Sequence, residues 1–165
     1  MSLKQKLQED LKSSMKNKDN TKKSVVTLIR ASIKQFEVDN RVELDDSQVI
    51  DIIAKLLKQT KDSLNEFKKA GREDLATQAE ALDEFAKANR EDLISETEAE
   101  IKVLKEYLPQ QLSEEELNEI VIATISEVGA TSMKDMKQIM SSIMPKVKGR
   151  ADGKLINELV RKNLQ

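Results

Sequence analysis

The stretch YLPQQLSEEEL, residues 107–117, indicates where this chain divides into parts. Pro109 has no amide hydrogen and cannot continue a helical hydrogen-bond ladder, so a helix that precedes it must end there. Ser113 is followed three residues later by Glu116, which is the pattern of a capping box at the start of a new helix. We therefore expect a domain boundary between these two signals.

The segment after this boundary predicts three short helices. The first ends at Gly129, the second opens at Ser132 and stops at Pro145, and the third follows a turn that contains glycine. No strand signal competes with this helical periodicity. We expect an all-α protein, with an N-terminal helical domain of long helices over 1–109 and a C-terminal three-helix tail domain over 110–165.

The N-terminal domain is typical of successive amphipathic helices. Apolar residues recur at helical spacing over 3–15, 25–36 and 49–67. Asp45 or Asp46 is placed to cap the third of these helices at its start. Gly71 fits a left-handed cap at its end, because glycine has no Cβ to clash there.

A near-repeat of 18 residues follows. LNEFKKAGREDLATQAE (64–80) matches LDEFAKANREDLISETE (82–98) at 10 of 17 positions. Eighteen residues make five turns at about 3.6 residues per turn, so the insertion preserves the phase of a helix. The second copy either lengthens one helix or adds a short helix between caps at Gly71 and Asn89. We favour an elongated helix with a weak point near Asn89.

The composition restricts the chemistry that is available. The chain has no cysteine and no histidine, which excludes thiol nucleophiles, thiolate metal sites and the commonest general base. We find no set of catalytic residues, and we expect no cofactor and no metal. No apolar run approaches about 18 residues and no secretory signal opens the chain. We therefore expect no membrane association and a cytoplasmic location.

Charge is distributed unevenly along the chain. Residues 1–41 carry a net charge of +5, residues 42–133 carry −12 and residues 134–165 carry +5. Much of the C-terminal positive charge lies in MPKVKGRADGKLINELV (144–160), together with two of the four glycines. Basic side chains supply charge there, and glycines let the backbone approach a phosphate closely. The candidate RNA-binding residues are Lys146, Lys148, Gly149, Arg150, Gly153 and Lys154.

Two interpretations of this turn remain open. If Asp152 caps the last helix, the free amides and positive dipole end of that helix reach the same place. Recognition of RNA by backbone shape suits such a site, whereas an aromatic content of 2% argues against stacking of single strands. The alternative is an interhelical turn with surface lysines, whose glycines only relieve steric strain.

Three segments resemble the GatB/YqeY family. They are EFKKAGREDL (66–75), YLPQQLSEEEL (107–117) and MKDMKQIMSSIMPKVKGRADGKLINELV (133–160). The family includes stand-alone proteins of the YqeY type and the C-terminal tail domain of the B subunit of the glutamine-dependent tRNA amidotransferase. The second copy around 84–93 looks like an addition to the usual pattern.

The resemblance implies a relation to a tRNA amidotransferase, and the residues of this chain favour a non-catalytic accessory protein. In the amidotransferase, the related tail is associated with gripping the folded body of the tRNA. The resemblance therefore implies tRNA, an amidotransferase or another tRNA-handling protein as partner. Family descriptions also mention carbon–nitrogen ligase activity with glutamine as amide donor, but this chain has no glycine-rich phosphate loop and no amidase signature. A third hypothesis is a protein–protein adaptor that docks through the acidic middle helices.

Overall fold

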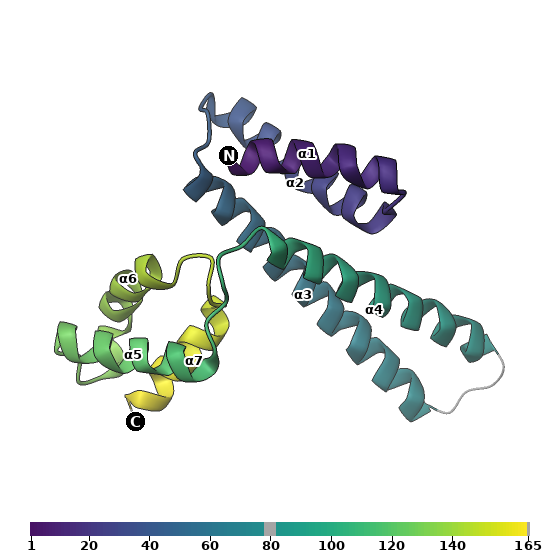
Figure 1. The fold of residues 1–165 in the computed structure, drawn as a ribbon. Helices are drawn as coiled ribbons and strands as arrows, with labels where there is room; N and C mark the ends of the chain where they lie inside the picture. Colours follow the sequence, from purple (N-terminus) through teal and green to yellow (C-terminus); the bar gives the residue numbers. More distant parts are fainter. Residues whose placement is uncertain (78–81, 165) are drawn as a thin grey trace. The chain divides into compact units, whose positions relative to one another are not determined.

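The computed structural model describes the backbone of residues 1–77 and 82–164, and the side chains of 1–71 and 90–164. Within these residues every regular element is helical, which confirms the predicted all-α class (Figure 1). The elements are α1 (Leu3–Asn17), α2 (Asn20–Asn40), α3 (Asp46–Thr77), α4 (Leu82–Glu106), α5 (Glu114–Val128), the 3₁₀ turn η1 (Met133–Asp135), α6 (Met136–Val147) and α7 (Gly153–Asn163).

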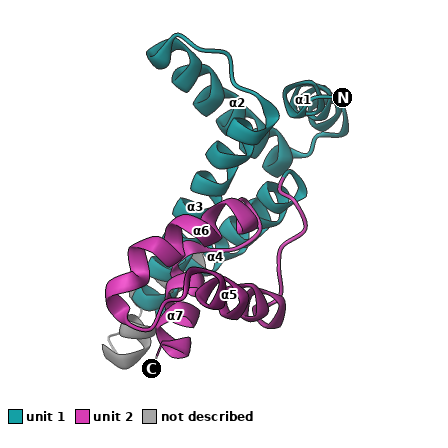
Figure 2. Cartoon of the chain, turned by 90° about the vertical axis from the view of Figure 1, so that its left-hand side faces the viewer, with its two compact units in different colours: residues 1–107 teal, residues 108–165 magenta. Residues whose placement is uncertain are grey.

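The chain forms two compact units, Met1–Tyr107 and Leu108–Gln165, which Figure 2 colours teal and magenta. In the first unit α1 packs against α2, and α3 lies beside α4 in the opposite direction (Figure 1). In the second unit α5 packs against both α6 and α7. The division into an N-terminal domain over 1–109 and a C-terminal tail domain over 110–165 stays a prediction.

Each unit has an aliphatic core of its own, because each amphipathic helix turns its apolar face toward its neighbours. Side chains under 2% exposed fill the core of the first unit: Leu7, Val26, Ile29, Val49, Ile53 and Leu104. The core of the second unit is formed by Leu117, Val121, Ile139, Ile143, Val147, Ile156, Leu159 and Val160.

The predicted helix starts are confirmed by local hydrogen bonds. The amide of Gln48 donates to Asp45 Oδ1 at 2.8 Å, so Asp45 is the residue that caps α3. Ser113 and Glu116 exchange both hydrogen bonds of a capping box at the start of α5. Gly129 ends α5 with φ of 63°, in the left-handed region.

The predicted cap at Gly71 is wrong. Helix α3 runs through Gly71 to Thr77, and α4 runs through Asn89, so neither residue ends a helix. Residues 64–77 of the first copy form the end of α3 and the second copy begins at the start of α4, on two neighbouring antiparallel helices. Both interpretations of the repeat are therefore wrong. A glycine inside a helix costs only about 1 kcal/mol, which packing between long helices can offset.

The predicted stop at Pro145 is also wrong. Helix α6 continues past Pro145 to Val147. The proline forfeits one backbone hydrogen bond, but the side chain of Val147 is only 1% exposed within the core of the second unit. Burial of Val147 keeps the last turn of α6 in place.

Candidate nucleic-acid interface

The turn between α6 and α7 is a tight reversal around Gly149. Gly149 has φ of 69°, a left-handed conformation that costs a residue with a Cβ about 1–2 kcal/mol. The amide of Arg150 then donates to the carbonyl of Val147 at 2.9 Å, which closes the turn. The left-handed φ accounts for glycine at this position, and the close approach of a phosphate to it stays a prediction.

The segment that precedes α5 holds this turn from the side. The side-chain amide of Gln111 donates to the carbonyl of Gly149 at 2.7 Å, and the backbone amide of Leu112 donates to the carbonyl of Arg150 at 2.9 Å. In the reverse direction, Nε of Arg150 donates to the carbonyl of Gln110 at 3.1 Å. These three hydrogen bonds join residues about 40 positions apart. The turn is therefore braced by the segment before α5, and its conformation does not depend on its own sequence alone.

The four predicted basic side chains have different surroundings. Lys146 forms an ion pair with Glu127 and donates to Thr124 Oγ1 at 3.3 Å, both on α5. Arg150 is half-buried and binds the carbonyl of Gln110. Lys148 and Lys154 are exposed. Three of the four side chains, those of Lys146, Lys148 and Lys154, are thus exposed, and Lys146 also pairs with α5, while Arg150 is half-buried against the segment before α5.

The start of α7 is already capped by an acid. Asp152 Oδ1 accepts a hydrogen bond of 2.9 Å from the amide of Lys154, so the predicted cap is confirmed. The Asp152 carboxylate takes one of the free amides and adds a negative charge where a phosphate would approach. Gly153 lacks a positive φ, and a Cβ built there would meet nothing within 4 Å. Its backbone conformation and surroundings therefore do not require glycine.

The bracing residues Gln110, Gln111 and Leu112 were missed as part of this site. The sequence shows only that two glutamines lie between Pro109, which follows α4, and the capping serine of α5. This pattern does not by itself indicate which backbone groups the glutamines bind. Their partners lie about 40 residues away, and no local pattern indicates such a pairing.

Elsewhere, the shifted pKa values belong to contacts of the first unit. A hydrogen bond from Lys4 and another from the amide of Leu44 lower the pKa of Glu37. Burial and a hydrogen bond of 2.5 Å to Asp10 raise the pKa of the Tyr107 hydroxyl. These contacts join α1 to α2, α2 to the connection before α3, and α1 to Tyr107, the residue after α4. They stabilise the unit, and Lys4 and Glu37 also line a surface cavity of about 510 Å³ between α1 and α2.

Among the residues that the structure describes, no group of three or more histidine, cysteine, aspartate or glutamate side chains is arranged to hold a metal ion. No helix there combines the length and the apolar composition that crossing a membrane requires.

Several curated proteins are similar to this chain. The protein named "Altered inheritance of mitochondria protein 41, mitochondrial" from Kluyveromyces lactis is 43% identical over 70 residues, which are 42% of this chain and 38% of that one. Its namesake from Pyrenophora tritici-repentis is 26% identical over 161 residues, 96% of this chain and 77% of that one. The chain thus spans less than two fifths of the Kluyveromyces relative.

Part of an amidotransferase is also similar. The E subunit of the glutamyl-tRNA(Gln) amidotransferase from Saccharolobus solfataricus is 40% identical over 60 residues, which are 36% of this chain and 10% of that protein. The predicted relation to an amidotransferase is therefore confirmed at the level of sequence.

The predicted cytoplasmic location is contradicted by these relatives. Four of them, from different yeasts, carry a name that ends in "mitochondrial". The prediction rested on the lack of a long apolar segment, which bears only on membrane insertion and secretion. Mitochondrial targeting segments are amphipathic and basic, so that argument does not apply to them.

The family comparison covers nearly the whole chain. The model described as "Yqey-like protein" matches residues 4–81 and again residues 77–164. The two matches overlap at 77–81, which are the last four residues of the first copy and the residue that follows it. The predicted resemblance is confirmed, and the chain belongs to the YqeY-like protein family.

Proposed function

We propose that this protein is a non-catalytic RNA-binding protein that contacts tRNA, alone or within an amidotransferase-type complex, through the braced turn between α6 and α7. The observation that carries the proposal is the pair of exposed lysines, Lys148 and Lys154, on either side of this turn. The similarity to part of a glutamyl-tRNA(Gln) amidotransferase supports tRNA as the class of RNA.

The braced turn suits recognition of a phosphate backbone. Because Gln111 and Leu112 hold the turn, Lys148 and Lys154 project from a rigid base and lose less backbone entropy on binding. No aromatic residue occurs in 108–165, so bases have no ring to stack on there. Contacts to phosphates and to RNA shape are the mode that remains.

The negative charge of Asp152 limits the strength of this site. A phosphate near the start of α7 meets both the Lys154 ammonium and the Asp152 carboxylate that caps the helix. We therefore expect weak, salt-sensitive binding in the micromolar range, as for a few phosphate contacts.

The test compares two variants with the same change in charge. K148A/K154A removes the exposed lysines at the turn, and K134A/K137A removes two lysines near the start of α6. Fluorescence anisotropy with total tRNA at about 50 and about 200 mM salt should show weaker binding and a smaller salt slope for the first variant, by roughly one unit per lost contact.

The control determines how the result is interpreted. We expect K134A/K137A to bind nearly as well as the unmodified protein. Equal losses in both variants would show that binding follows overall charge, and unchanged binding by K148A/K154A would remove the turn from the argument.

A second function is participation in glutamine-dependent amide transfer, which the similarity to the amidotransferase favours. The chain would need a partner that supplies the nucleophile and the ATP site, since it has neither cysteine nor a phosphate-binding loop. Ammonia release from glutamine should then rise when this protein is added to amidotransferase subunits. No rise with any combination of those subunits would exclude this role.

A further inference from the structure

The surface cavity between the first two helices has the size of a site for a small molecule. Helices α1 and α2 are antiparallel neighbours, since Lys4 near the start of α1 pairs with Glu37 near the end of α2 (Figure 1). The cavity between them has a volume of about 510 Å³, within the range of pockets that hold small ligands.

Aliphatic side chains form the inner part of this cavity. Leu7 is fully buried, Ile33 is 5% exposed and Leu11 is half-buried, and all three line it. The polar side chains Gln8, Arg30 and Lys34 are exposed and form its rim. A ligand with an apolar body can therefore remove part of this aliphatic surface from water, chiefly at Leu11.

Two bases on the rim are available to a ligand. Arg30 and Lys34 lie one turn apart on α2, a spacing that places their Cβ atoms about 5–6 Å from each other. Neither side chain forms a hydrogen bond or an ion pair within the part of the chain that the structure describes. Lys4, by contrast, pairs with Glu37 and lies 3.8 Å from Glu43. Three bases and one acid line the cavity, so its formal net charge is +2.

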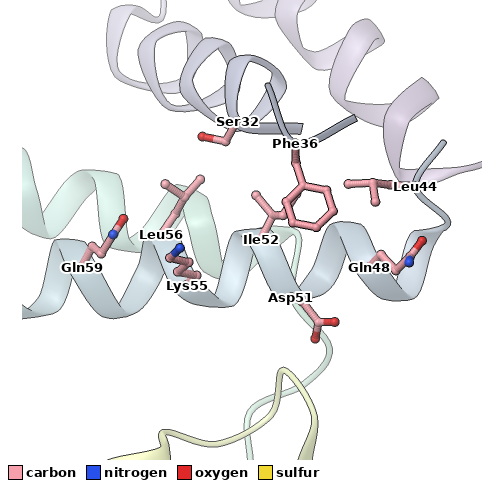
Figure 3. A pocket seen from close by; sticks show the side chains of 9 residues that line it. All are labelled: Ser32, Phe36, Leu44, Gln48, Asp51, Ile52, Lys55, Leu56 and Gln59. Carbon is pink, nitrogen blue, oxygen red and sulfur yellow. The ribbon is translucent and has the colours of Figure 1, made fainter. Parts of the chain in front are cut away.

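A second surface cavity in this unit differs in charge. Its volume is about 410 Å³, and it lies between α2, the connection to α3, and α3 itself. Figure 3 shows Phe36, Leu44 and Ile52 at its centre, with Asp51 pointing away from them. Its only charged lining residues are that acid and one base, Lys55, so their formal charges cancel. An anion is therefore expected to prefer the first cavity.

We propose that the cavity between α1 and α2 binds a small phosphate monoester that has an apolar body. A phosphate monoester carries a charge of about −1.5 to −2 near pH 7, which matches the charge of Arg30 and Lys34 together. Its terminal oxygens can accept hydrogen bonds from the Arg30 guanidinium, the Lys34 ammonium and the side-chain amide of Gln8. The apolar body then covers Leu11.

The combination of charge and aliphatic surface favours this ligand over other anions. A carboxylate or an RNA phosphodiester carries a single charge and would leave one of the two bases unmatched. Inorganic phosphate matches the charge but makes no use of the aliphatic surface. This inference concerns the first unit and does not depend on RNA binding at the turn before α7.

The test is a titration of the full, ¹⁵N-labelled chain with hexyl phosphate, followed by amide chemical shifts. We expect saturable shifts at residues 4–11 and 27–34 and none at 44–59. Inorganic phosphate and hexanol should each bind at least about tenfold more weakly, because each supplies only the charge or only the apolar body.

Three variants locate the site. R30A/K34A should weaken the binding of hexyl phosphate at least about tenfold and leave the thermal melt unchanged, since both side chains are exposed. K12A/K16A removes the same charge from exposed positions of α1 outside the cavity and should bind normally. F36A alters the second cavity and should also bind normally.

Several results would overturn the proposal. A dissociation constant for hexyl phosphate above about 10 mM would be too weak for a specific site. Equal losses in R30A/K34A and K12A/K16A would reduce the effect to overall charge, and a loss in F36A alone would place the probe in the second cavity.

Two further measurements separate other sources of phosphate. If R30A/K34A weakens tRNA binding while hexyl phosphate does not bind, the two bases belong to an RNA contact and the proposal is wrong. Vesicles of phosphatidylcholine with phosphatidic acid present the same group on a lipid. Sedimentation of the protein with these vesicles, abolished in R30A/K34A, would assign the site to a lipid headgroup and overturn the choice of a small ligand.

Discussion

The side-chain amide of Gln111 and the carbonyl oxygen of Gly149 form a hydrogen bond of 2.7 Å across 38 positions of sequence. Gln111 belongs to the segment before α5, and Gly149 is the left-handed residue of the turn before α7. Together with the bonds to Arg150, this contact turns a run of basic residues into a rigid corner. Residues that brace the corner can therefore be separated by experiment from residues that bind RNA.

Loss of the Gln111 brace should destabilise the second unit. Gln111→Ala leaves the carbonyl of Gly149 without its side-chain donor, and we expect the free energy of unfolding to fall by about 1 kcal/mol. Urea unfolding followed by circular dichroism measures this change. Gln138→Ala, at an exposed position of α6, is the matched control and should have little effect. Equal effects of the two changes would show that the brace does not contribute.

The two glycines of the turn should respond in opposite ways to alanine. Gly149→Ala places a Cβ at φ of 69° and should destabilise the protein by about 1–2 kcal/mol. Gly153→Ala lies at the first position of α7 with open space around it, so stability should stay the same or rise slightly.

The same pair tests how closely RNA approaches. If a phosphate approaches the backbone at Gly153, the alanine variant should bind tRNA less tightly while melting normally. A destabilised Gly153→Ala variant would contradict the absence of neighbours around that position.

The contact between Glu37 and α1 should make stability depend on pH. The hydrogen bonds from Lys4 and from the amide of Leu44 lower the pKa of Glu37 below its ordinary value. A carboxyl with a lowered pKa in the folded state stabilises the protein above its unfolded pKa, and this stabilisation is lost as pH falls through the folded pKa. Above about pH 5, the unmodified protein should therefore have a higher urea midpoint than Glu37→Gln. The difference between the two midpoints should disappear below about pH 4.

The control for this measurement is Glu9→Gln, on an exposed part of α1. Its midpoint should stay close to that of the unmodified protein at every pH. A gap for Glu37→Gln that grows as pH falls would contradict the sign of the pKa shift.

Removal of one repeat should shorten the two long helices without loss of the core. Among the described side chains of 58–71 and 90–96, none is buried. We therefore expect deletion of residues 72–89 to reduce the helical signal and to change Tm by less than about 4 °C, equivalent to about 1 kcal/mol. Ile53→Ala, in the core, should cost about 2–5 kcal/mol by comparison. Failure of the deletion variant to fold would show that the repeat carries structural contacts.

The sequence-based predictions succeeded where one local interaction determines the structure. The capping box of Ser113 and Glu116, the left-handed cap at Gly129 and the cap at Asp152 all span five residues or fewer. Such signals hold because the partner of each free backbone group lies within the same turn. They predicted the helical class and the position of the basic turn.

The predictions failed where packing competes with a local preference. Gly71 and Pro145 are ordinary helix terminators, yet both lie inside helices. The cost is about 1 kcal/mol for glycine and about 3 kcal/mol for proline, and it is offset when a long helix packs along a neighbour or a residue such as Val147 enters the core. The same argument applies to the repeat, whose copies lie on two different helices.

The sequence alone determined the all-helical class, the family resemblance and the concentration of charge over 144–160. These features follow from composition, periodicity and capping, which act locally. Folding in three dimensions assigned a separate role to each charged side chain. It brought Lys146 into an ion pair with Glu127, and it placed Arg150 where its side chain donates a hydrogen bond to the segment before α5. It left Lys148 and Lys154 exposed. The roles of Lys146 and Arg150 depend on partners 19 to 40 positions away, which the chain meets only when the helices pack together.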